Sequence, residues 1–110
     1  MQKQSLEALA RELSAKAATV TGGRAAETVL GGHEKVLRQT VIAMVAGAEL
    51  TEHANPGEAS VYVLRGRVAL VSGGQSWEGR DGDLLIVPDS PHSVQALQDS
   101  VILLTVAKLP

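Results

Sequence analysis

Short stretches in which apolar and polar residues alternate cover most of this chain, beginning near residue 25. Such alternation is typical of a β-strand with one buried face. Turn-forming residues separate the stretches roughly every 8 to 12 positions, for example at Ser72-Gly73-Gly74 and at Asp81-Gly82-Asp83. The pattern predicts strands at 25–30, 35–46, 49–53, 59–64, 67–72, 75–78, 83–87, 92–97 and 101–107. We therefore expect an all-β domain built from antiparallel strands.

A different periodicity at the N-terminus predicts a helix over residues 5–18. Ser5 is suited to cap its first turn, and Glu7 lies where the helix dipole favours an anion. Apolar residues recur there at spacings of three and four, at Leu6, Leu9, Ala10, Leu13 and Ala17. This stripe needs a surface to pack on, either the β-domain or a partner subunit. We expect a helical arm at 1–24 and a barrel at 25–110.

Composition narrows the class of protein. The 110 residues are 45% hydrophobic, which is enough for one core, and no apolar run is long enough to span a bilayer. The net charge is −2 with both signs interspersed, so no basic surface for a nucleic acid is present. Cysteine is absent, which excludes disulfides, thiolate ligands and a cysteine nucleophile. Because the N-terminus also lacks a signal-peptide pattern, we expect a cytoplasmic protein without nucleic-acid or membrane partners.

Two histidine-containing hairpins carry the functional signal. The stretch Gly47–Gly66 places His53 at the end of a strand, before a Pro-Gly turn. The stretch Gly82–His92 again combines a strand, a proline turn and a histidine. With these two motifs the sequence resembles the cupins, a superfamily of small RmlC-like jelly-roll barrels. The resemblance covers residues 47–96 and implies a cupin double-stranded β-helix barrel, preceded by an N-terminal α-helix, with a site inside it.

In the cupins, three histidines and a glutamate hold one divalent metal inside the barrel. The resemblance assigns His53 and His92 to two of these positions, whereas Asn55 replaces the second histidine and Ala59 replaces the glutamate. Glu58 is the candidate to replace the missing glutamate. Alternation along the strand directs its side chain outward, so it can act as a ligand only if the Pro-Gly turn reorients it toward the interior. The implied metal ligands are His53, His92 and Glu58, and the implied cofactor is Zn, Ni, Fe or Mn, or none.

Strand parity also predicts which side chains face the interior. Ala59, Val61 and Val63 share the inward face of one strand, and His92, Val94 and Ala96 share that of another. Asn55 and Glu49 lie an even number of positions from His53, so a continuous strand would place their side chains on the same face as this histidine. This makes them candidates for ligand binding. Trp77 is the third candidate, as a residue lining the mouth, with a core or dimer-interface anchor as the alternative.

The sequence leaves three functions open. The first is a binding module that holds a small molecule, with or without a divalent metal, inside the barrel. The second is a metal-dependent cupin enzyme of the dioxygenase, isomerase or decarboxylase type. The third is a metal-free enzyme in which His53 or His92 acts as a general base. We prefer the binding module, because two metal-ligand positions carry other residues, and we expect a homodimer that buries an apolar outer face.

Overall fold

One helix and nine strands follow one another along the part of the chain that the structure describes, in the predicted order. The structure is a computed structural model, and it describes residues 2–52 and 57–108. The elements are α1 (Leu6–Ala17), β1 (Arg24–Leu30), β2 (Leu37–Met44), β3 (Glu49–Glu52), β4 (Gly57–Arg65), β5 (Arg67–Ser72), β6 (Gln75–Arg80), β7 (Leu84–Ile86), β8 (His92–Ala96) and β9 (Ser100–Lys108).

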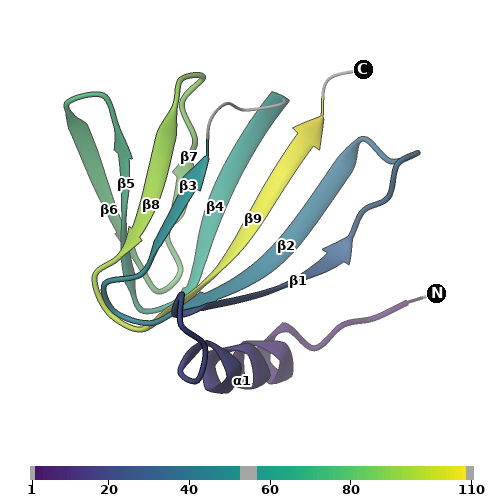
Figure 1. Ribbon diagram of the computed structural model, residues 1–110. Helices are drawn as coiled ribbons and strands as arrows, with labels where there is room; N and C mark the ends of the chain where they lie inside the picture. Colours follow the sequence, from purple (N-terminus) through teal and green to yellow (C-terminus); the bar gives the residue numbers. More distant parts are fainter. Residues whose placement is uncertain (1, 53–56, 109–110) are drawn as a thin grey trace.

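The strands form two antiparallel sheets that face each other. One sheet has the order β1-β2-β9-β4-β7, and the other has the order β3-β8-β5-β6. The sheets converge near α1 and spread apart at the other end, which we call the open end (Figure 1). The β5–β6 turn and residues 88–91 lie at this open end. The prediction of an all-β jelly roll with an N-terminal helix is confirmed, although the sheets do not join into a closed barrel among the described residues.

Aliphatic side chains fill the space between the two sheets. The alternation predicted for β4 and β8 is confirmed, because Val61 and Val63 are completely buried and Val94 is 3% exposed. Burial of each such side chain contributes about 1.5–3 kcal/mol, so this interior is the main source of stability. The buried members of the cluster are Ile42, Met44, Val61, Val63, Val68, Leu70, Val87, Val94, Ala96, Ile102, Leu104 and Val106.

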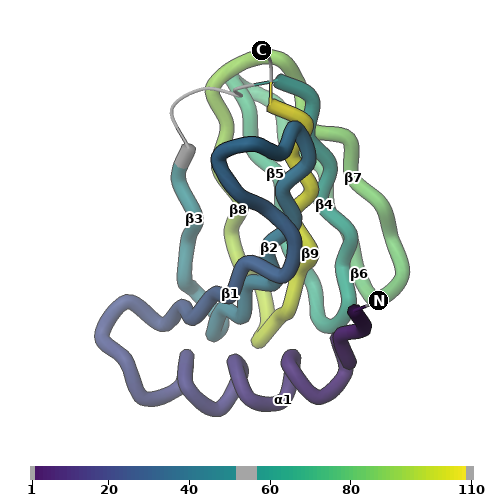
Figure 2. The backbone as a smooth tube through the Cα atoms, turned by 90° about the vertical axis from the view of Figure 1, so that its right-hand side faces the viewer, coloured from purple at the N-terminus to yellow at the C-terminus, as the bar shows by residue number. Residues whose placement is uncertain are grey.

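Helix α1 packs on the outer face of the five-stranded sheet. Its Ser5 cap is confirmed by a hydrogen bond from the Ala8 amide to Ser5 Oγ, 3.2 Å long. Its buried residues, which include Leu9 and Leu13, contact Val41 and other outward-facing residues of the sheet. Figure 2 shows the helix lying across the ends of the strands. The apolar stripe is thus covered by the chain's own sheet. The described residues contain no helix that is long and apolar enough to cross a membrane.

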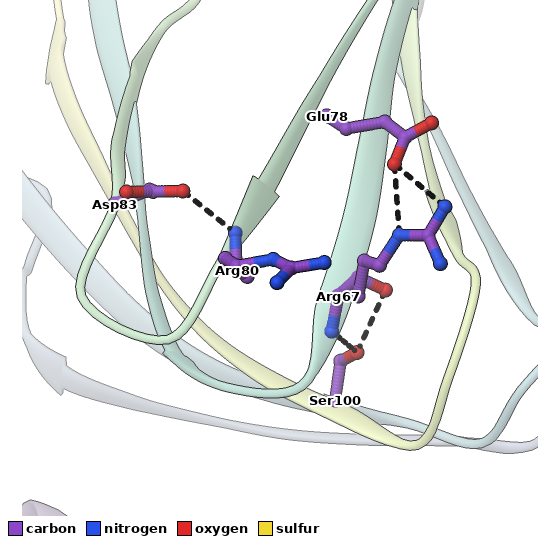
Figure 3. Close-up of polar contacts among 5 residues, drawn as sticks. All are labelled: Arg67, Glu78, Arg80, Asp83 and Ser100. Carbon is purple, nitrogen blue, oxygen red and sulfur yellow. Dashed lines mark hydrogen bonds and ion pairs between the residues drawn. The ribbon is translucent and has the colours of Figure 1, made fainter.

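Polar contacts hold the corner at the α1 end of the sandwich (Figure 3). The buried Ser100 hydroxyl accepts a hydrogen bond from the Arg67 amide at 3.0 Å. The Arg67 guanidinium donates from Nε and from a terminal nitrogen to one oxygen of Glu78, at 2.8 Å each. This hydrogen bond and ion pair lower the pKa of the Glu78 carboxyl and raise that of Arg67. Because both side chains are largely exposed, the pair contributes little to the stability of the fold.

Candidate functional site

His92 lies at the open end, on the inner face of β8. Its neighbour on that face, Val94, pairs with Leu50 of β3 and Leu70 of β5, so the next layer toward α1 is apolar. The His92 side chain is 7% exposed. Among the described residues, His92 and Ser100 are the buried polar or charged side chains, and Ser100 bonds to the adjacent backbone. His92 therefore places a buried imidazole at the open end of an aliphatic interior.

The contact to Ser90 determines the tautomer of His92. Its Nδ1 lies 3.0 Å from the Ser90 carbonyl oxygen. A carbonyl oxygen only accepts hydrogen bonds, so Nδ1 carries the proton and donates it. In the neutral ring, Nε2 is then the basic nitrogen. A neutral imidazole in general can act as a hydrogen-bond acceptor, a metal ligand or a general base.

Serine hydroxyls fix the turn that holds His92. Ser72, at the end of β5, lies 2.7 Å from the Ser90 hydroxyl and donates to the Pro91 carbonyl at 2.9 Å. A hydroxyl has one proton, so Ser90 must be the donor to Ser72. These hydrogen bonds connect the end of β5 to the 88–91 turn. The Ser90 carbonyl, which orients His92, belongs to this turn.

Two of the predicted site residues, His53 and Asn55, lie outside the described residues. Glu58 is exposed on β4, next to the inward Ala59, as strand parity predicts. It lines a groove of about 670 Å³ together with Ser60 and Ile86, on the outer side of the five-stranded sheet. The structure therefore does not bring Glu58 next to His92. Its role as a metal ligand stays a prediction, and this placement does not favour it.

Glu49 is also exposed, which differs from the expectation that it faces the interior. Its carboxylate accepts a hydrogen bond from Thr51 at 3.3 Å. Leu50 packs into the interior instead, because it pairs with the buried Val94. Counted from Leu50, alternation along β3 places Glu49 on the outer face. A role for Glu49 in ligand binding stays a prediction.

Trp77 lies at the open end and belongs to neither buried cluster. Its side chain is 44% exposed, so it is not a core residue. It lines a groove of about 560 Å³ between the β5–β6 turn and the 88–91 turn. This location agrees with the expectation that it lines the mouth, whereas the alternative of a dimer anchor stays open.

The donor set for a metal is incomplete in the part of the chain that the structure describes. Among residues 2–52 and 57–108, no group of three or more His, Cys, Asp or Glu side chains is arranged to hold a metal ion. His92 alone does not make a metal site, since stable sites usually offer at least three donors. We therefore derive no chemical step through a metal.

Known proteins share the fold of this chain. Solved structures with the same fold include a conserved Streptococcus pyogenes protein of unknown function, with 24% identity and a TM-score of 0.73 over 83% of this chain and 79% of that one. An RmlC-like cupin protein from Desulfovibrio desulfuricans has 28% identity and a TM-score of 0.67 over 76% and 81% of the two chains. No curated protein sequence matches this chain.

A variant of salicylate 1,2-dioxygenase from Pseudoaminobacter salicylatoxidans has 24% identity and a TM-score of 0.78. The match covers 94% of this chain but 34% of the enzyme, so it shows a shared fold alone. The family described as "Cupin domain" matches residues 40–107, which include most of the interior-facing strands and His92. This match extends over more than half of the sequence, and the chain therefore belongs to the cupin family.

Proposed function

We propose that this cupin domain is a binding module that holds a small molecule at the open end of the sandwich. The observation that carries this proposal is the buried His92, on the inner face, with its Nδ1 proton directed to the Ser90 carbonyl. The contact to Ser90 holds the imidazole in one orientation, so a polar ligand at the open end would meet the ring in a defined geometry. Small molecules that carry a hydroxyl or an amide group are suited to hydrogen bonding beside an imidazole.

The apolar surroundings strengthen such a contact. Val94, Leu70 and Leu50 form the layer beneath His92. A hydrogen bond near this wall is screened less by water than one on the surface, and the wall offers apolar contact to the rest of the ligand. The site thus suits a small molecule with a polar end and an apolar end.

A divalent metal is compatible with the same imidazole. If one is held, His92 supplies one ligand, and the sequence resemblance assigns His53 as another. The alternative function remains a metal-dependent cupin enzyme, and a salicylate 1,2-dioxygenase is among the solved structures that share this fold. Any such metal would hold and polarise a ligand beside the apolar wall.

Calorimetry on matched variants tests the proposal. Wild type, His92→Ala and His33→Ala are titrated with Zn²⁺ alone and with small amides, alcohols and carboxylic acids. His33 is exposed on the β1–β2 connection and is the matched control. We expect at least one probe to bind wild type and His33→Ala, and not His92→Ala. Binding unchanged in His92→Ala, or no binding of any probe to wild type, would overturn the proposal.

A further inference from the structure

Beside the His92 site, the open end contains a groove that we call the Trp77 groove. It is lined by Ser72, Gly73, Gly74, Gln75, Trp77, Pro88, Ser90 and Pro91, and its volume is about 560 Å³. We propose that this groove binds a neutral aromatic ring, stacked on the indole of Trp77. His92 does not line it, and this proposal goes beyond the function proposed above.

The position of Trp77 is the first observation. Trp77 pairs with the buried Leu70 across β5 and β6, so it is on the inner side of an edge strand. Its neighbour on that side, Gly79, is buried against Leu85. Despite this inward side of the strand, Trp77 remains 44% exposed. Ligand sites are typically concave and lined by apolar and aromatic side chains, as this groove is lined by Trp77.

The charge of the lining determines the charge of the ligand. None of the residues that line the groove carries an ionisable side chain. A carboxylate or an ammonium group would be partly desolvated here without a counter-charge, which is unfavourable. The groove therefore selects a neutral molecule.

The polar groups of the lining favour an aromatic ring over a sugar. The Ser72 and Ser90 hydroxyls are bonded to each other, and Ser72 also donates to the Pro91 carbonyl. Few hydrogen-bonding groups are then left for the many hydroxyls of a sugar. Trp77, Pro88 and Pro91 instead offer flat apolar surfaces, and stacking of this kind contributes beyond the area buried.

The β5–β6 turn leaves room for such a ring. A Cβ atom added at Gly73 or Gly74 would meet no atom within 4 Å, so this side of the groove is open. The volume of the groove lies within the usual range for small-molecule sites, about 300–1,000 Å³. One ring with a short substituent fits, and Gln75 is placed to bond to the substituent.

Fluorescence tests the proposal directly, because Trp77 is the single tryptophan of the chain. Its emission is recorded during titration with benzyl alcohol, which is neutral and aromatic. Cyclohexylmethanol is the matched probe without an aromatic ring, and benzoate is the matched charged probe. We expect a saturable change with benzyl alcohol and a response at least about tenfold weaker for each of the other two.

Variants separate the groove from the other sites. Binding of benzyl alcohol, followed by its own NMR signals, is expected to weaken about tenfold in Trp77→Ala. It should persist in Leu97→Ala, an exposed apolar control. Retention of benzyl alcohol binding in Trp77→Ala would overturn this proposal.

Three further outcomes would also contradict it. One is the absence of a saturable response to benzyl alcohol, and another is an equal response to cyclohexylmethanol or benzoate. The third is a Trp77 emission that shifts on dilution and does not respond to benzyl alcohol, because a second copy of the chain would then cover the groove.

Discussion

Gly66, at the corner between β4 and β5, shows how one residue fixes the local path of the chain. Its φ of +94° is in the left-handed region that side chains rarely adopt. Its amide donates to Asp81 at 2.7 Å, and an added Cβ would collide with the Asp99 carbonyl oxygen and with Ser100. The close approach of these segments at the α1 end therefore depends on a residue without a side chain.

We expect Gly66→Ala to lower the free energy of unfolding by at least about 2 kcal/mol, because backbone strain adds to the collision. Gly74→Ala is the control, since its φ is ordinary and nothing lies within 4 Å of the added carbon. Its effect should stay within about 0.5 kcal/mol. Urea denaturation of both variants measures the difference, and equal stabilities would show that the corner does not require glycine.

Single residues also mark where sequence reasoning succeeded and where it did not. The inward face of His92 was predictable, because Val94 and Ala96 alternate with polar residues in the same short strand. The outward orientation of Glu49 was not predictable from the sequence. Alternation counted from His53 places Glu49 on the same face as this histidine, whereas alternation counted from Leu50 places it on the opposite, outer face. The pairing of Leu50 with Val94, a contact distant in sequence, decides between them.

At the level of secondary structure, local sequence patterns were sufficient to predict the helix and the strands of the described residues. The Ser5 cap and the apolar stripe predicted α1, and turn residues predicted all nine strands to within a few positions. The contacts between turns were not predictable in this way. Ser72 and Ser90 lie 18 positions apart, and their hydrogen bond depends on how β5 and β8 pack.

Helix α1 should contribute to stability as part of the domain. Leu13 is 6% exposed and packs against the outer face of the sheet. We expect Leu13→Ala to lower the free energy of unfolding by about 2–4 kcal/mol, through lost burial and a residual cavity. Glu12→Ala, on the exposed side of the same helix, should change it by no more than about 0.5 kcal/mol. If both variants melt like wild type, the helix is not docked on the sheet in solution.

At the scale of the whole molecule, we propose that the exposed edge beside β7 forms the interface of a homodimer. Ile86 is 71% exposed, Leu84 is 58% exposed, and Tyr62 is 38% exposed. Tyr62 pairs with Leu84, so these side chains share the outer face of the sheet that ends in β7. An apolar face along an unpaired strand edge is the kind of surface that a second copy covers.

Sedimentation equilibrium tests this interface. We expect wild type to be dimeric and Ile86→Lys to be largely monomeric, because the two-fold contact would bury two unpaired charges, one from each copy. Val36→Lys, on the exposed β1–β2 connection, is the control and should leave the dimer intact. A monomeric wild type, or an Ile86→Lys dimer of unchanged affinity, would contradict this assignment.

A residue-resolved NMR titration of the wild-type protein tests whether a small molecule binds beside His92 at the open end. Zn²⁺ alone and the amide, alcohol and carboxylic acid probes are added, and the backbone amide signals are followed. We expect the largest shifts on β8, from His92 to Ala96, and at the end of β5, and we expect these shifts to vanish in His92→Ala. Shifts confined to the outer groove around Glu58, or no shifts with any probe, would contradict it.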